Sequence, residues 1–168
     1  MMLKEQKSEI QESLNEEINQ GIEEERPEEV DCVRILFTVQ DESQLRDCAK
    51  YLSNYWSDEK DLDYELKEEL IRRLPRVNTQ IQKELWASLL KNLNFSVKEK
   101  LFIVELLCFW LCSSISEDTV KINCMYTLSE LINKNDFSRQ TAISSIRNQM
   151  IWGSLRVKEV GNEILQKI

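Results

Sequence analysis

The chain has 168 residues, the length of one ordinary domain with room for a hydrophobic core. Its formal net charge is −8, and it holds only three glycines and two prolines, too few turn residues for most β-rich folds. It contains no histidine, which excludes Ser–His and Cys–His nucleophile pairs, a histidine general base and the HExxH zinc helix.

Other catalytic and metal-binding motifs are also missing from the sequence. There is no GxxxxGK[ST] or GxGxxG loop for phosphates and no CxxC-like zinc pair. We therefore predict a protein that is not an enzyme and has no cofactor or metal. The five cysteines are an odd number in a chain without an apparent signal peptide, which favours reduced thiols. Cys108 and Cys112 could form a redox or metal pair, but two small core residues are the favoured interpretation.

The first part of the chain is strongly acidic. Residues 1–40 carry eleven acidic and four basic side chains, and the block 16–29 alone holds seven glutamates. Such a segment could dock on a basic partner or mimic a nucleic acid, but a solvated leader is favoured. Ile10, Leu14 and Ile18 allow a weak helix over 8–20. We assign residues 1–26 to this acidic leader and residues 27–168 to a helical domain.

From Pro27 onward, start and stop signals divide the chain into eight predicted helices. Pro27 followed by two glutamates opens a helix that runs to about Val39. Asp41 or Ser43 opens the next, which ends near Trp56. After a polar turn, leucines at four-residue spacing predict a helix over 62–74, which Pro75 ends.

The second half continues in the same way. Asn78 or Thr79 caps a helix that runs to about residue 93, and Ser96 with Glu99 forms a capping box before 97–113. Further helices are predicted over 117–133 and 137–152, and Gly153-Ser154 separates the last helix. The run LFIVELLCFWLC (101–112) is 12 residues long, whereas a membrane span needs about 20. We therefore expect a buried helix in a soluble, cytoplasmic protein with no membrane contact.

Every second helix repeats one pattern. The segments LRDCAKYLSNYW, IQKELWASLLKNL, VKINCMYTLSELI and VKEVGNEILQKI start at residues 45, 81, 120 and 157. An apolar residue opens each segment, a residue that is small in three of the four copies follows four positions later, and an apolar residue follows seven or eight positions later. The fifth positions are occupied by Ala49, Leu85, Cys124 and Gly161. A period of 36 to 39 residues built from two helices is typical of an α-solenoid.

These segments resemble the first helices of HEAT or armadillo-type repeats, and VKINCMYTLSEL and VKEVGNEIL match best. The resemblance covers residues 42–168, although the early proline and the inter-helix aspartate of HEAT repeats are missing. It implies an all-α, right-handed α-solenoid of about three and a half helical hairpins. An irregular helical bundle is the alternative.

In HEAT-type proteins, the second helices of the hairpins line the concave surface where partners bind. The resemblance therefore implies a non-catalytic adaptor or regulator whose groove binds a protein or peptide partner. Glu105 interrupts the most apolar helix and is flanked in the pattern by Phe102 and Phe109. The candidate partner-binding residues on the second helices are Glu65, Glu68, Arg72, Glu105, Thr141, Ser145 and Asn148.

Nucleic-acid binding is the alternative function, by analogy with the HEAT-like DNA-alkylation-repair glycosylases. Arg72, Arg73 and Arg76 cluster, and residues 71–168 carry fourteen basic and nine acidic side chains. Phosphate binding usually requires a continuous basic stripe, however, and the candidate face mixes charges. The sequence therefore favours a protein partner and leaves the oligomeric state open.

Overall fold

All the regular elements in the described part of the chain are helices. The computed structural model describes residues 28–56, 61–132 and 138–168, so the acidic leader and the weak helix expected over 8–20 lie outside it. The all-helical prediction is confirmed. The α-helices are α2 (Glu29–Thr38), α3 (Glu42–Tyr55), α4 (Tyr64–Arg73), α5 (Gln80–Leu89), α6 (Val97–Cys112), α7 (Asp118–Leu131), α8 (Arg139–Trp152) and α9 (Leu155–Lys167), with short 3₁₀ helices η1 (Leu74–Arg76) and η2 (Leu90–Asn92).

Side-chain caps fix where four of the helices begin. The Asp41 carboxylate accepts a hydrogen bond from the Gln44 N–H at 2.8 Å, and the Thr79 hydroxyl accepts one from the Gln82 N–H. Ser96 and Glu99 form the predicted capping box at the start of α6, and Ser154 caps α9. These contacts satisfy N–H groups that have no partner within the helix, so the starts could be predicted from local sequence.

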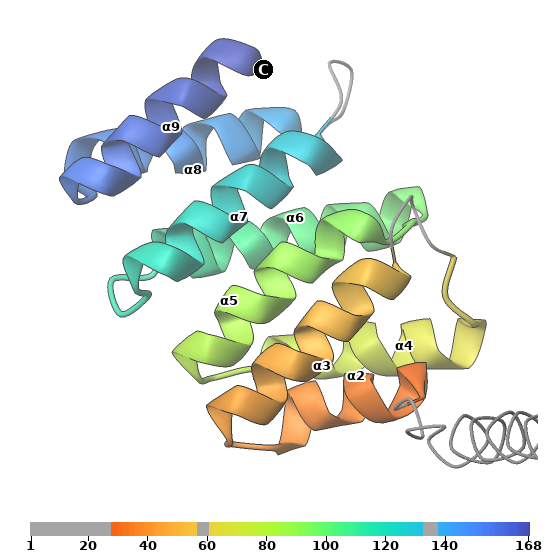
Figure 1. The fold of residues 1–168 in the computed structure, drawn as a ribbon. Helices are drawn as coiled ribbons and strands as arrows, with labels where there is room; N and C mark the ends of the chain where they lie inside the picture. The colour runs from red at the N-terminus through yellow and green to blue at the C-terminus, as the bar shows by residue number, and fades with distance from the viewer. Residues whose placement is uncertain (1–27, 57–60, 133–137) are drawn as a thin grey trace, which may run out of the picture.

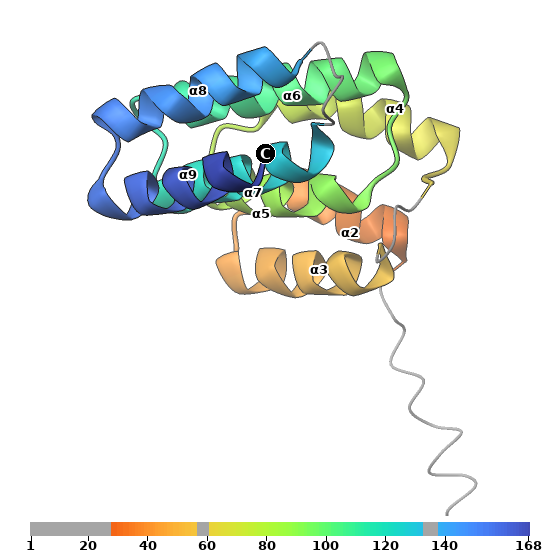
Figure 2. The same cartoon turned by 90° about the horizontal axis from the view of Figure 1, so that it is seen from above.

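The helices lie in two rows. Helices α3, α5, α7 and α9 follow one another side by side, and each packs on the next (Figure 1). Helices α4, α6 and α8 form a second row (Figure 2), with α6 packed on α8 and the Lys67 ammonium 3.7 Å from the Glu99 carboxylate between α4 and α6. The α4–α5, α6–α7 and α8–α9 turns lie along one edge, which we call the turn edge (Figure 1). This arrangement is also compatible with the irregular helical bundle.

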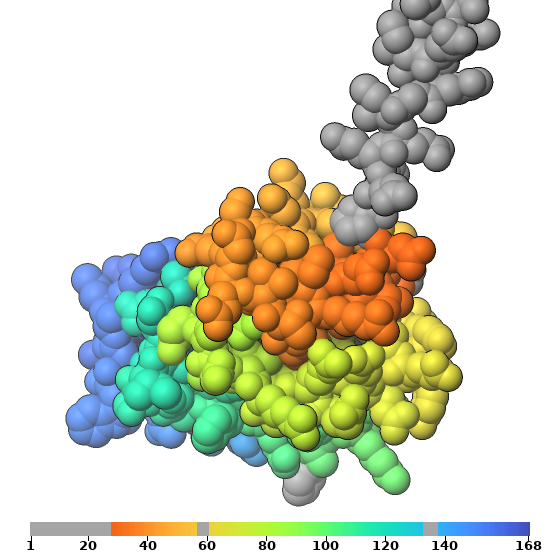
Figure 3. All heavy atoms as spheres, turned by 90° about the horizontal axis from the view of Figure 1, so that it is seen from below, coloured from red at the N-terminus to blue at the C-terminus, as the bar shows by residue number. Residues whose placement is uncertain are grey.

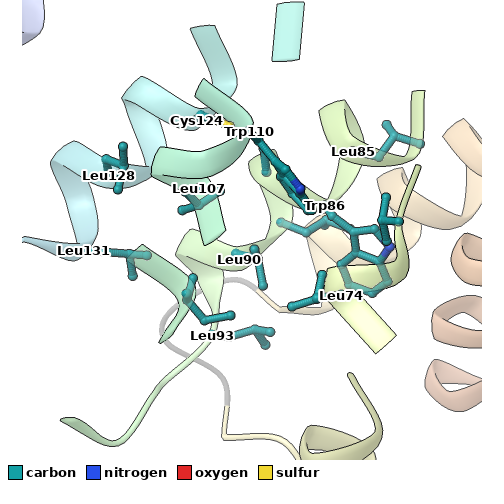
Figure 4. Packing of buried hydrophobic residues seen from close by; sticks show 14 of the residues in the cluster. Leu74, Leu85, Trp86, Leu90, Leu93, Leu107, Trp110, Cys124, Leu128 and Leu131 are labelled. Carbon is teal, nitrogen blue, oxygen red and sulfur yellow. The ribbon is translucent and has the colours of Figure 1, made fainter. Parts of the chain in front are cut away.

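One hydrophobic cluster runs through both rows. Its largest fully buried side chains include Trp56, Trp86 and Trp110. Figure 4 shows Trp86 and Trp110 among leucines from the neighbouring helices. Phe37 stacks on Trp86 with ring centroids 4.6 Å apart, which joins α2 to α5. The core is therefore continuous along the described chain.

Positions that repeat in the sequence are buried in the structure. The fifth-position residues Ala49, Leu85, Cys124 and Gly161 are all buried, as are the apolar residues Leu52, Leu89, Leu128 and Ile164 that follow them. A Cβ atom added to Gly161 would lie 2.8 Å from the Met150 sulfur of α8 and 3.5 Å from the Met125 sulfur of α7. Glycine at this position therefore lets α9 approach both neighbouring helices closely.

Several hydrogen bonds join one helix of the first row to the next helix of that row or to the turn before it. Gln80 of α5 binds the backbone of Ile115 and Glu117 before α7, and Ser154 before α9 donates to the Asp118 carboxylate of α7. Asn123 and Thr127 of α7 donate to backbone carbonyls of α5. The residues in these bonds are 35 to 40 positions apart in the sequence. This range includes the spacing of 36 to 39 residues between the repeated segments of the sequence.

Helix α6 carries the most apolar stretch of the chain. Six of its residues are buried, and the helix packs on both α7 and α8. Within the described ranges, neither α6 nor any other helix has the length and apolarity that a membrane crossing requires.

Candidate partner-binding surface

The structure places the candidate residues of α4 on the surface. Glu65, Glu68 and Arg72 are exposed, as predicted from the leucine pattern. None of them has an ion pair with another described residue, whereas Lys67 and Arg73 of the same helix do. These three residues form a solvated face of mixed charge.

Glu105 reaches water on the outer side of α6. Its side chain is exposed and has no hydrogen bond or ion pair within the described part of the chain. Phe109, one turn later, is 69% exposed, and Leu101, one turn earlier, is also exposed. Phe102, expected beside Glu105, instead packs against the core. The exposed stripe around Glu105 therefore runs through Leu101 and Phe109.

On α8, the structure separates the three candidate residues. Thr141 and Asn148 are exposed, but Ser145 is only 8% exposed and is not on the open surface where we expected it. Ser145 lies against Cys108 of α6. Burial raises the pKa of the Cys108 thiol, and its contact with the Ser145 hydroxyl offsets part of that rise. Ser145 is a small residue in the contact between α6 and α8.

A hollow of about 470 Å³ opens at the turn edge, where α6 and α8 end. We call its wall the Trp152 surface, defined as Cys112, Ser114, Lys121, Asn148, Gln149 and Trp152. Asn148 is the one candidate residue that lines it. Cys112 is exposed here while Cys108 is buried, so the two cysteines do not both belong to the core. No group of three or more potential metal ligands occurs among the described residues.

Large apolar side chains are exposed around this hollow. Trp152 is 83% exposed and directly follows the exposed Ile151, and Leu155 is exposed at the start of α9. Phe109 lies one turn before Cys112 on α6. Exposed aromatic residues beside a hollow mark interaction sites on protein surfaces. The sequence analysis named Phe109 beside Glu105, but it did not single out Ile151, Trp152 or Leu155.

Gln149 gives the hollow an amide that makes no side-chain hydrogen bond to a described residue. The residue is 6% exposed and lines the hollow. Its amide atoms are not among the fully buried unpaired ones, so they face solvent in the hollow and are open to a ligand. The amide can both donate and accept, as a peptide backbone requires.

The sequence of α8 and of the start of α9 is basic, opposite in sign to the whole chain. Residues 138–158 contain Arg139, Arg147, Arg156 and Lys158 and no acidic residue. Arg139 donates to the backbone oxygen of Ile168, but Arg147 and Arg156 are exposed and form no ion pair with a described residue. Lys121 adds a cation to the wall of the hollow. Glu117 and Asp118 also lie at this edge, and the Asp118 carboxylate accepts from Ser154. Lys121 is the charged residue among those that line the hollow, so the wall itself favours a partner with an acidic group.

Comparison with protein-family models, with curated proteins and with solved structures finds no match to this chain.

Proposed function

We propose that the chain is a non-catalytic adaptor or regulator that binds an acidic peptide segment of a protein partner at the Trp152 surface. The exposed Trp152 beside the Gln149 amide, which has no side-chain hydrogen bond to a described residue, carries this proposal. Trp152 and Phe109 offer contact area for apolar side chains, which dominates binding energy at protein interfaces. Gln149 and Asn148 can pair with the peptide backbone, and Lys121 can pair with a carboxylate.

We also propose that the architecture is a HEAT-like, right-handed α-solenoid of about three and a half hairpins. The two rows of helices and the hydrogen bonds between residues 35 to 40 positions apart support it. Each hairpin of a solenoid packs on its neighbours, and turns of successive hairpins gather along one edge. The proposed partner site lies on that edge, at the ends of the second helices α6 and α8, rather than along the concave surface that the resemblance implied.

Peptides selected from a display library against the whole chain provide a direct test. Trp152→Ala should weaken binding of the selected peptides by about 2 kcal/mol or more, the loss typical of a central aromatic residue. Tyr64→Ala is the matched control, because Tyr64 is an equally exposed aromatic residue on α4, away from the hollow. Fluorescence anisotropy with labelled peptides gives the affinities. Equal effects of the two substitutions, or selected peptides without acidic residues, would contradict the proposal.

Nucleic-acid binding, the alternative function, gives a different result in the same assay. A labelled oligonucleotide would bind with an affinity that falls steeply with salt, because phosphate contacts release counterions. Its binding would also depend on Arg147 and Arg156, whose conversion to glutamine removes two exposed cations. Tight, salt-sensitive oligonucleotide binding without peptide binding would replace the adaptor by a nucleic-acid-binding protein.

A further inference from the structure

We infer that a second hollow, between the end of α2 and the α4–α5 turn, binds a carboxylate attached to an apolar or peptide group. The hollow measures about 300 Å³ and is lined by Phe37, Arg73, Arg76, Val77, Asn78 and Gln82. Figure 3 shows the face where α2 and α3 (orange) lie against the α4–α5 segment (yellow-green). The inference does not depend on the proposed function, since the two hollows share no residue.

Arg73 is held in place before any ligand arrives. Its guanidinium is 2.7 Å from the Glu69 carboxylate and 5.8 Å from the centroid of the Phe37 ring. The Phe37 ring is itself fixed by stacking on the buried Trp86. A guanidinium held on two sides loses little side-chain freedom on binding, which favours recognition of a planar anion.

Arg76 supplies a charge that no described residue pairs with. It is exposed and forms no ion pair or side-chain hydrogen bond with the described residues. Its backbone belongs to η1, where Pro75 restricts the chain and the Val77 N–H bonds to the Leu74 carbonyl at 3.1 Å. The turn therefore fixes where the Arg76 side chain leaves the backbone.

Two amides complete the set of donors in this hollow. Gln82 is only 7% exposed, and its side-chain oxygen accepts a hydrogen bond from the Thr79 hydroxyl at 2.9 Å. Because the oxygen faces Thr79, the NH₂ group of Gln82 faces away from Thr79. This NH₂ group has no acceptor in the described part of the chain. Asn78 adds a second side-chain amide beside the first turn of α5, where the helix dipole also favours an anion.

The charges select a carboxylate over a phosphate. Arg73 and Arg76 carry two positive charges, and Glu69 neutralises one of them, so one charge remains to be balanced. A phosphate monoester carries about −1.5 to −2 charges at neutral pH and would exceed this balance. Phe37 and Val77 form an apolar wall, which suits a carboxylate on an apolar group. A free organic acid and the C-terminal residue of a peptide both have this chemistry.

Titration followed by ¹H–¹⁵N NMR tests the site with N-acetylphenylalanine as the probe. The side-chain amide signals of Asn78 and Gln82 and the indole signal of Trp86 should shift on addition. The same probe with its carboxylate converted to an amide should not bind. Arg76→Gln should weaken binding by about tenfold or more, as expected for loss of a charge-assisted hydrogen bond. Arg72→Gln, the matched control, removes the same charge from a residue that does not line the hollow and should leave binding unchanged.

Comparison of two acids distinguishes the source of the carboxylate. Phenylacetate binding as tightly as N-acetylphenylalanine would indicate a free organic acid, and tighter binding of N-acetylphenylalanine would indicate a peptide end. If Arg76→Gln perturbs the fold, Asn78→Ala provides a second variant. It removes an amide donor but no charge, and it should also weaken binding. Trp152→Ala should leave this titration unchanged, so failure here is distinct from failure at the Trp152 surface. Binding of the neutral amide, stronger binding of inorganic phosphate, or equal losses in Arg72→Gln and Arg76→Gln would overturn the inference.

Discussion

At the scale of single residues, Gly161 has the clearest physical requirement. Glycine inside a helix costs about 0.5–1 kcal/mol relative to alanine, so its presence in α9 needs a compensating contact. That contact is the approach to Met150 and Met125. Gly161→Leu should lower the free energy of unfolding by about 1–3 kcal/mol, because the added side chain overpacks the contact between α9, α8 and α7.

Urea denaturation measures this loss, and Gly161→Ala is its control. One methyl group meets the flexible end of the Met150 side chain, which can move, so the alanine variant should lie close to the wild type. A leucine variant as stable as the wild type would show that α9 can move away from its neighbours at no cost.

At the scale of elements, the start of α6 links local capping to the contact between α4 and α6 within the second row. Burial alone would raise the pKa of Glu99, but its hydrogen bonds with Ser96 and the nearby Lys67 ammonium lower the pKa overall. A carboxyl whose pKa is lower in the folded state contributes stability above its unfolded pKa, about 4.3, and this contribution is lost as the pH falls through the folded pKa.

Glu99→Gln should therefore destabilise the protein at pH 7 and have a smaller effect in acid. The measurement is the free energy of unfolding by urea at both pH values. Glu105→Gln is the control on the same helix, because Glu105 is exposed and lacks a partner among the described residues. If Glu99→Gln is as mild at neutral pH as the control, the negative charge of Glu99 and its contact with Lys67 add nothing to stability, since glutamine can keep the hydrogen bond of the capping box.

The capped helix starts and the burial of the repeated positions could be predicted, while the surface could not. The caps Asp41, Thr79 and Ser96 act within one turn, so local sequence contains the whole signal. The exposures of Ser145 and Trp152 depend on how α8 rotates against α6, and α8 lacks a strong amphipathic pattern to fix that rotation. The Arg73 and Phe37 hollow joins residues from two separate hairpins, which no local pattern reveals.

At the scale of the whole molecule, the described helices form a core that has its own anchor at the N-terminal end. The Trp56 indole N–H donates to the Glu29 carboxylate, which ties the first turn of α2 to the end of α3. The acidic leader contributes little apolar sequence to bury. A variant that begins at Arg26 should therefore melt within about 4 °C of the full chain, as measured by thermal unfolding. A larger decrease would show that the leader packs on the helices.

The contact pattern of the two rows has a consequence for how this protein can change in length. Helix α9 packs on α7 and α8. Among the described residues, the hydrogen bonds between helices of the first row join each helix to the next helix of that row. In the solenoid architecture that we propose, each hairpin presents to the next the same kind of surface that it received from the previous one. A hairpin added at one end would then leave the contacts between the existing hairpins intact, whereas loss of α8 and α9 would remove Asn148, Gln149 and Trp152 from the Trp152 surface.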